Sequence, residues 1–148
     1  MRNEDVPSVV AIANSLEEAP HWPSKAYLGA LDPDSFPARI LMVAEDAVAG
    51  VVGFAVTVLI PPQAELESIA VTKSAQRRGI ARRLFGELIA SLKEREITEV
   101  MLEVRESNRA ARALYASLGF VETGRRAGYY SEPKEDAVLL SRSDFGTG

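Results

Sequence analysis

The chain has 148 residues, of which 47% are apolar, a formal net charge of -4 and no cysteine. This length is enough for one core of ordinary domain size, so we expect a single domain over residues 1–148. The acidic balance argues against a general nucleic-acid or membrane-surface binder, and the lack of cysteine excludes disulfides, thiolate metal sites and a cysteine acyl-enzyme. Because no signal-peptide pattern and no membrane-length apolar run occurs, we expect a cytoplasmic protein.

The hydrophobic period predicts two helices at the start of the chain and then a change to strands. Apolar residues at helical spacing indicate a helix from about 5 to 18, and a second short helix begins near Ser24, after the break APHWP. Three runs rich in apolar and β-branched residues predict strands at 39–46, 49–60 and 64–71. The first two strands form a hairpin that ends at Pro61 and Pro62.

The second half of the chain predicts alternating helices and strands. A helix after Gly79 carries apolar side chains four positions apart. Ser107 or Asn108 can cap a second helix, which ends at Gly119. Three strands are predicted in this half, at 99–105, about 120–130 and about 136–141. The resulting order ααβββαβαββ is that of an α/β sandwich with a mixed sheet.

The segment QRRGIA, residues 76–81, lies where a strand pattern gives way to a helical one. A helix N-terminus offers unpaired N–H groups and the positive end of the helix dipole, and Gly79 has no Cβ to block a ligand. An anion therefore fits there, with neighbouring arginines adding positive charge. A loop glycine beside a solvent-exposed basic helix would give the same sequence pattern. The two common nucleotide-binding motifs, GxxxxGK[ST] and GxGxxG, do not occur.

The segments LESIAVTKSAQRRGIARRLFGELI and EVMLEVRESNRAARALYASLGF together resemble the GNAT acyltransferases. The family signature (Q/R)xxGx(G/A) is met by Gln76, Gly79 and Ala81, and its NxxAxxLYxxLGF segment is met by residues 108–120. The likeness covers nearly the whole chain, and the tail GRRAGYYSEPKEDAVLL is similar to the RimI subgroup of ribosomal-protein N-terminal alanine acetyltransferases. Two features depart from the family: Ala81 stands for the last signature glycine, and only residues 1–4 precede the first helix.

The resemblance implies the GNAT fold, which is a mixed, mostly antiparallel sheet flanked by helices, with the first strand short or missing in this chain. It also implies acetyl-CoA as the donor, no metal, and direct transfer of the acetyl group. The implied cofactor contacts are Ile69, Ala70 and Val71 beside the pantetheine, Arg77, Arg78, Gly79, Ile80, Ala81 and Arg82 around the pyrophosphate, and Asn108.

The same likeness implies Glu103 as general base and Tyr115 as general acid. These roles fit the chemistry, because an ammonium cannot attack a thioester until a base has taken its proton, and the leaving thiolate must be stabilised. A tyrosine with a pKa of about 10 is better suited to donate a hydrogen bond than a proton to a thiolate whose thiol has a pKa of about 8.5. The alternatives are Glu67 as the base, a solvent-facing role for Glu103 and simple packing for Tyr115.

The acceptor implied by the resemblance is the N-terminal α-amine of a protein, such as a ribosomal protein, with no nucleic acid or membrane partner. At pH 7 an α-amine needs about 1.4 kcal/mol to lose its proton and a lysine needs about 4.6, so a single carboxylate suits an α-amine. Tyr129 and Tyr130 are expected to line a peptide groove, unless the tail only completes the sheet. The other hypotheses are a protein lysine, a small-molecule amine, or a non-catalytic acyl-CoA-binding module.

Overall fold

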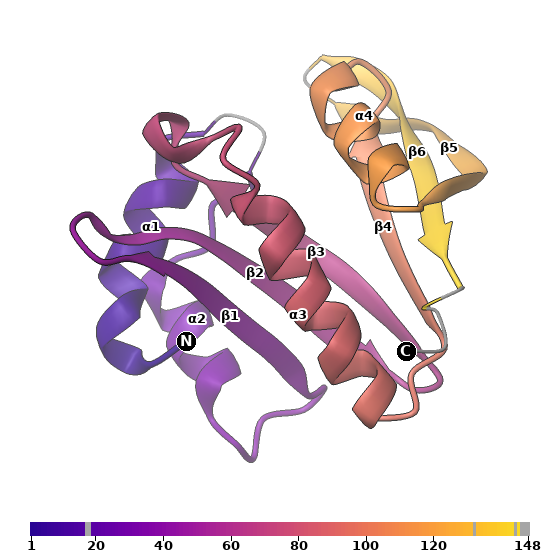
Figure 1. The fold of residues 1–148 in the computed structure, drawn as a ribbon. Helices are drawn as coiled ribbons and strands as arrows, with labels where there is room; N and C mark the ends of the chain where they lie inside the picture. The colour runs from indigo at the N-terminus through magenta and orange to yellow at the C-terminus, as the bar shows by residue number, and fades with distance from the viewer. Residues whose placement is uncertain (17–18, 132, 144, 146–148) are drawn as a thin grey trace.

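The computed structural model describes residues 1–16, 19–131, 133–143 and 145, and it forms a six-stranded sheet with helices on both faces (Figure 1). The strand order is β1-β2-β3-β4-β6-β5. The strands are β1 (Arg39–Asp46), β2 (Gly50–Ile60), β3 (Gln63–Val71), β4 (Glu99–Arg105), β5 (Val121–Ser131) and β6 (Lys134–Arg142). Only β3 and β4 are parallel neighbours. The predicted mixed, mostly antiparallel sheet is therefore confirmed.

The helices occur in the predicted order. They are α1 (Val6–Asn14), α2 (Ser24–Leu31), α3 (Ile80–Glu94) and α4 (Arg109–Ser117), with short 3-10 turns η1 (Asn3–Asp5) and η2 (Lys73–Ala75). The first helix ends at Asn14, earlier than predicted, where the Ser15 hydroxyl donates to the Ile12 carbonyl at 2.7 Å and competes with the helical ladder. Residues 17–18 of the predicted helix lie outside the described residues. No helix within the described ranges is long and apolar enough to cross a membrane.

Two hydrophobic cores lie on opposite faces of β2. Because successive strand residues point to opposite faces, Phe54 and Val56 join the core under α1 and α2, whereas Ala55 joins the core under α3. The Tyr27 ring of α2 packs edge-on against Phe54 at 6.1 Å between centroids. A strand covered on both faces appears in the sequence as a continuous apolar run, which is the pattern of 49–60.

The strands β3 and β4 pair only near their first residues. The ladder ends where Glu65 faces Met101, although both strands continue, and beyond this point they diverge (Figure 1). A bulge at Glu67, which the pairing with β2 skips, increases the bend and twist of β3. The edge of β3 that faces β4 therefore has no strand partner over 66–71 in the described structure.

The outer edge of β1 carries the start of the chain. The Met1 amine donates to the Leu41 carbonyl at 3.0 Å, and no strand precedes α1 within residues 1–16. The first strand of the family is thus missing from the described residues, as the sequence led us to expect.

Candidate active site

The turn between β3 and α3 is shaped by two residues with positive φ. Arg77 has φ 65°, and Gly79, with φ 78°, is the N-cap of α3 and makes no side-chain cap. Gln76 ties this turn to β3, because its Nε2 donates to the Val71 carbonyl at 3.0 Å. A Cβ added to Gly79 would meet no atom within 4 Å. The space beside Gly79 at the N-terminus of α3 is therefore open, and an anion can approach the first N–H groups of the helix there.

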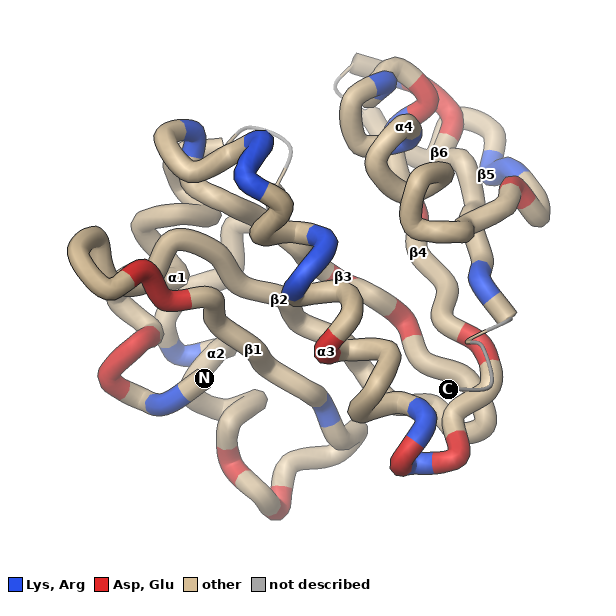
Figure 2. Tube along the Cα trace, viewed as in Figure 1, with Lys and Arg blue, Asp and Glu red and all other residues tan. Residues whose placement is uncertain are grey.

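Basic residues gather near the start of α3 (Figure 2), and the arginines of the turn differ in their partners. Arg78 pairs with Asp46 at 3.2 Å. The backbone N–H groups of Ala49 and Val48, followed by Arg78, hold the pKa of Asp46 below its ordinary value. Arg77 makes no hydrogen bond or ion pair with any described residue, so its charge is available to a ligand, whereas that of Arg78 is shared with Asp46.

A cavity of about 620 Å³ lies between α3 and the C-terminal end of α4. Its lining residues are Arg82, Phe85, Gly86, Ile89, Ser117, Leu118, Gly119 and Arg142. Apolar walls with a cationic rim suit a ligand that has both an anionic and a nonpolar part. The cavity follows α3 away from the anion-binding turn, and the sequence did not predict it because residues far apart in the chain line it.

The predicted pantetheine contacts lie at the end of β3. Ala70 and Val71 are buried, whereas Ile69 is half-buried and packs against the core under α3. These residues belong to the stretch of β3 whose edge toward β4 has no strand partner. Main-chain groups on such an edge can hydrogen-bond an extended ligand that contains amides.

The rival base Glu67 is engaged by a partly buried partner. Its carboxylate accepts from Arg39 Nε at 2.8 Å, and the two side chains are only 21% and 23% exposed. An acceptor amine would have to displace this guanidinium before it could reach Glu67. The geometry therefore favours Glu103, although the choice of base stays a prediction.

Glu103 lies on β4 just beyond the point where the two strands part. Arg126 Nε is 3.4 Å from its Oε1, and the Tyr129 hydroxyl donates a hydrogen bond to the carboxylate. Glu65 is near, and it forms no ion pair or hydrogen bond in the described part of the chain. Burial raises the pKa of Glu65, and the charges of Glu103 and Glu67 raise it further. The site thus has two carboxylates beside one exposed guanidinium.

Tyr115 lies on α4 with its ring 5.7 Å from that of Phe120. Burial, and then Tyr130, raises the pKa of Tyr115 to about 12. Transfer of its proton to a thiolate whose thiol has a pKa of about 8.5 would be uphill by about 5 kcal/mol. The hydroxyl is therefore suited to donate a hydrogen bond. Glu103 also raises the pKa of Tyr130, so Tyr115, Tyr130 and Glu103 form one electrostatic group.

Asn108 caps α4, because its side-chain oxygen accepts from the Ala111 N–H at 3.2 Å. Of the two predicted caps, Asn108 is confirmed, and Ser107 instead bonds the Glu135 carboxylate through its N–H and hydroxyl. The amide nitrogen of Asn108 donates to no described residue and is available to a ligand. Its contact with the cofactor stays a prediction.

Sequence reasoning missed Glu65 and Arg126 at this site. Glu65 lies two positions before Glu67, on the same face of a strand, and this spacing was the only signal that could have identified it. Arg126 pairs with Ala137 of β6 because the register of β5 shifts between Glu122 and Gly124, and strand alternation does not predict this shift, so it does not predict the approach of Arg126 to Glu103 either.

Comparison with known proteins gives the same family at the levels of sequence and structure. The model of the acetyltransferase (GNAT) family matches residues 9–120. The ribosomal protein bS18-alanine N-acetyltransferase of Salmonella typhimurium is 36% identical over 139 residues, which cover 93% of this chain and 90% of that protein. The crystal structure of the ribosomal-protein-S18-alanine N-acetyltransferase from Escherichia coli matches with a TM-score of 0.83 and 31% identity, covering 100% of this chain and 93% of that one. A putative streptothricin acetyltransferase from Bacillus anthracis, solved in complex with acetyl coenzyme A, matches with a TM-score of 0.66 and 27% identity, over 72% and 62% of the two chains.

Proposed function

The chain belongs to the acetyltransferase (GNAT) family, and we propose that it transfers an acetyl group from acetyl-CoA directly to the N-terminal α-amine of a protein. The Salmonella relative is named for an alanine of ribosomal protein bS18, and its identity over nearly the whole chain supports the same acceptor class here. We propose a ribosomal protein with N-terminal alanine as the acceptor, which places the reaction in the cytoplasm. The observation that carries the proposal is the divergence of β3 and β4, with Glu103 at its start.

The donor would extend from the turn before α3 to the start of the strand divergence. The open N–H groups at Gly79 and the charge of Arg77 suit a pyrophosphate, and the unpaired edge of β3 suits the two amides of a pantetheine. Acetyl-CoA supplies an acetyl group activated as a thioester. The residues present therefore fit this donor, and the cavity beside α3 can take further parts of it.

The acceptor amine would arrive as an ammonium and replace Arg126 on Glu103. The side chain of Arg126 is 58% exposed and its contact with Glu103 is long, so this exchange requires little rearrangement. Glu103 then takes a proton from the ammonium, directly or through water, and the free amine attacks the thioester carbon. The new C–N bond would form as the C–S bond breaks, and the Tyr115 hydroxyl would donate a hydrogen bond to the departing thiolate. The second proton that the nitrogen loses would pass to this thiolate, which leaves as the thiol.

Two tyrosines on β5 lie near Glu103, where β3 and β4 diverge, and they support a peptide acceptor. The Tyr129 and Tyr130 rings are nearly perpendicular, with centroids 5.1 Å apart. Tyr129 is 51% exposed, and Tyr130 is half-buried over Arg105, whose guanidinium carbon lies 4.1 Å from the ring centroid. A half-exposed aromatic pair beside a carboxylate can hold a short extended peptide, which supports the groove rather than a tail that only completes the sheet.

Acetylation of matched peptides tests the acceptor. One peptide has a free N-terminal alanine, and the other has the same sequence with a blocked N-terminus and an added lysine. We expect acetyl transfer to the first peptide at a much higher kcat/KM. Preference for the lysine peptide or for a free polyamine would refute the N-terminal acceptor and leave the acetyltransferase activity standing. Acetyl-CoA binding without transfer to any amine would indicate a non-catalytic binding module.

Calorimetry of a Gly79→Glu variant tests the donor site. The added bulk and negative charge would occupy the space in front of the α3 N–H groups, so we expect acetyl-CoA binding to be lost. Gly79→Ala is the matched control, because it imposes the same strain at φ 78° without the charge or most of the bulk. Unchanged affinity in Gly79→Glu would remove the basis for the proposed donor site.

A further inference from the structure

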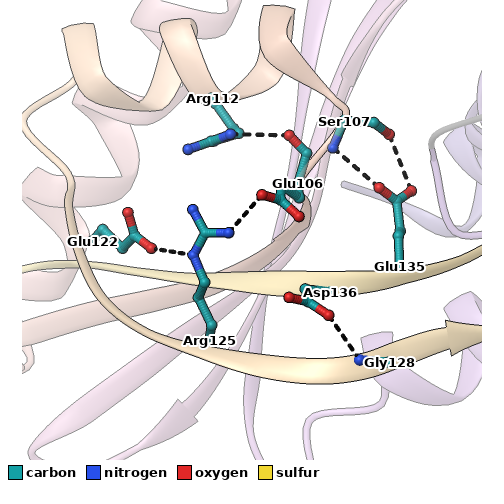
Figure 3. A network of polar contacts seen from close by, with 8 residues as sticks. All are labelled: Glu106, Ser107, Arg112, Glu122, Arg125, Gly128, Glu135 and Asp136. Carbon is teal, nitrogen blue, oxygen red and sulfur yellow. Dashed lines mark hydrogen bonds and ion pairs between the residues drawn. The ribbon is translucent and has the colours of Figure 1, made fainter.

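A single carboxylate on β6, that of Glu135, joins the end of β4 to the loop that leads into α4. Figure 3 shows its two bonds to Ser107 in this loop. Glu135 Oε1 lies 3.0 Å from Arg105 Nη1 and also accepts from the Ser107 hydroxyl at 3.0 Å. Its Oε2 accepts from the Ser107 backbone N–H at 3.1 Å. The side chain is only 15% exposed, so these bonds are partly shielded from water. Glu135 thus holds two residues of another chain segment at once.

The first contact of Glu135, with Arg105, connects it to the proposed base and acid. Arg105 is two residues after Glu103 on β4, and its guanidinium lies against the Tyr130 ring. Tyr130 is also the cross-strand partner of Glu135, so the carboxylate, the guanidinium and the ring form one stack. Tyr130 in turn influences Tyr115. A shift of Arg105 would therefore move the Tyr130 ring, which interacts electrostatically with both Glu103 and Tyr115.

The second contact of Glu135, with Ser107, connects it to α4. Ser107 directly precedes Asn108, the cap of α4, and α4 carries Tyr115. The Glu106 N–H donates to the Asp136 carbonyl at 3.2 Å, so the loop is held on β6 at two successive residues. No residue of α4 is fully buried, and its apolar side chains Ala111, Leu114 and Tyr115 pack only partly against the core, so the polar contacts at its start add to what fixes its position.

The remaining charges of Figure 3 provide a contrast. Arg125 pairs with Glu106 at 2.6 Å and with Glu122 at 2.7 Å, and these three side chains are 40 to 45% exposed. Neither carboxylate contacts Arg105, Ser107 or a tyrosine in the described structure. Exposed ion pairs such as those of Arg125 with Glu106 and Glu122 contribute little to stability, so these residues serve as an internal control.

We propose that Glu135 is a positioning residue for the proposed acetyl transfer, fixing Arg105 beneath Tyr130 and Ser107 at the start of α4. Through these two contacts it holds the base strand, the tyrosine pair and the acid helix in one arrangement. The Arg105 guanidinium, followed by the Ser107 bonds, also keeps the pKa of Glu135 below its ordinary value, so the carboxylate is charged at neutral pH. The inference rests on the proposed function.

The test is a series of variants compared by kcat and KM with acetyl-CoA and the N-terminal alanine peptide. Glu135→Gln keeps the size of the side chain and removes its charge, and Glu135→Asp keeps the charge and shortens the reach. We expect kcat to fall by about 10- to 100-fold in Glu135→Gln and by less in Glu135→Asp, because small misplacements of reacting groups have effects of this size. The KM for acetyl-CoA is expected to stay within about twofold of wild type, since all of its proposed contacts except Asn108 lie on β3, on α3 and in the turn between them. Glu122→Gln is the matched control and is expected to match wild type.

A double-variant cycle separates positioning from general stabilisation. If Glu135 acts partly through Tyr130, adding Glu135→Gln to Tyr130→Leu lowers kcat by less than it does in the wild type, because only the Ser107 contact is then left to lose. The inference would be overturned if the fold-reductions in kcat of the two single variants multiply fully in the double variant. It would also be overturned if Glu135→Gln lowers thermal stability and leaves kcat unchanged. If Glu135→Gln does not fold, Glu135→Asp takes its place in the cycle with the same expected coupling. An inactive wild type would instead contradict the proposed function, so the two failures are distinguishable.

Discussion

The strands β2 and β5 have the same length of 11 residues and opposite surroundings. β2 is buried without interruption from Val52 to Val58, between the cores on its two faces, whereas no residue of β5 is buried. β5 is also an edge strand that pairs only with β6. Apolar burial therefore stabilises the part of the sheet around β2, and pairing and charge hold the part around β5.

This contrast extends to the helices and the proposed site (Figure 1). α1, α2 and α3 bury apolar side chains against β1–β3, whereas α4 has no fully buried residue and follows a loop held by Glu135. The proposed donor turn follows the buried end of β3. Glu103 and Tyr115 lie on β4 and α4, which pack against the apolar core through Val104 and Leu114 and are also tied to β5 and β6 by polar contacts. Acetyl transfer would then take place between two sides of the molecule. Apolar burial holds the side formed by β3 and α3, and the geometry of the side formed by β4, α4 and β5 depends also on polar contacts.

The largest effect we expect is on catalysis in the charged part, from Glu103→Gln. Loss of a general base lowers the rate at neutral pH by about 10²- to 10⁴-fold, with cofactor affinity nearly unchanged. A higher pH is expected to restore part of the rate, since more of the amine is then already free. Glu67→Gln is the control, because Arg39 already occupies that carboxylate. If Glu67→Gln shows this pattern and Glu103→Gln does not, the base lies on β3.

The second prediction compares the two 11-residue strands directly by stability. Phe54→Ala on β2 removes a fully buried ring and is expected to lower the free energy of unfolding by about 3 to 5 kcal/mol. Val121→Ala on β5 removes apolar atoms from a side chain that is 63% exposed, and a change within about 0.5 kcal/mol is expected. Urea denaturation measures both. Similar losses would show that β5 is packed more tightly than its exposure indicates.

The same contrast explains which elements the sequence predicted. Strands whose apolar side chains pack against the cores have strong apolar runs, and the bounds of β1 and β4 agree with the predicted 39–46 and 99–105. β6 begins at Lys134, before the predicted 136, because its first residues are charged and pair with β5 without being buried. Hydrophobic period detects burial, so it does not detect ladder pairing between exposed residues.

The candidate site was predictable where a local motif fixed the backbone. Gln76 and Gly79 lie in a turn whose shape follows from their own sequence, and the structure has the expected glycine-initiated helix. The environment of Glu103 was not predictable, because it depends on the register shift in β5 and on side chains from three strands. Long-range polar contacts leave no periodic pattern in the sequence.

The third prediction sharpens the role of charge near the acceptor. Arg126→Gln removes the guanidinium that the incoming ammonium would have to displace from Glu103, so the KM for the peptide is expected to fall about threefold, the scale of an exposed ion pair. Arg125→Gln is the control, since its guanidinium contacts Glu106 and Glu122 instead. An increase in KM with Arg126→Gln would mean that this arginine binds the acceptor itself.

The smallest effect we expect concerns the unpaired carboxylate of Glu65, and it has opposite signs for stability and for binding. A raised carboxyl pKa means that ionised Glu65 destabilises the fold at neutral pH, so Glu65→Gln is expected to raise Tm at pH 7 by about 1 °C. The wild type gains stability relative to the variant as the pH falls through the raised pKa toward the ordinary value of 4.5, and the difference in Tm should shrink over that interval. The same variant is expected to raise the KM for a cationic acceptor about threefold, because one of two carboxylates near the ammonium is gone. Glu67→Gln is the matched control with the opposite sign for stability, since it leaves Arg39 without its partner. A lower Tm for Glu65→Gln at pH 7 would contradict this account, whereas a higher Tm with weaker acceptor binding would mean that the charged part of the molecule keeps Glu65 for function although it lowers stability.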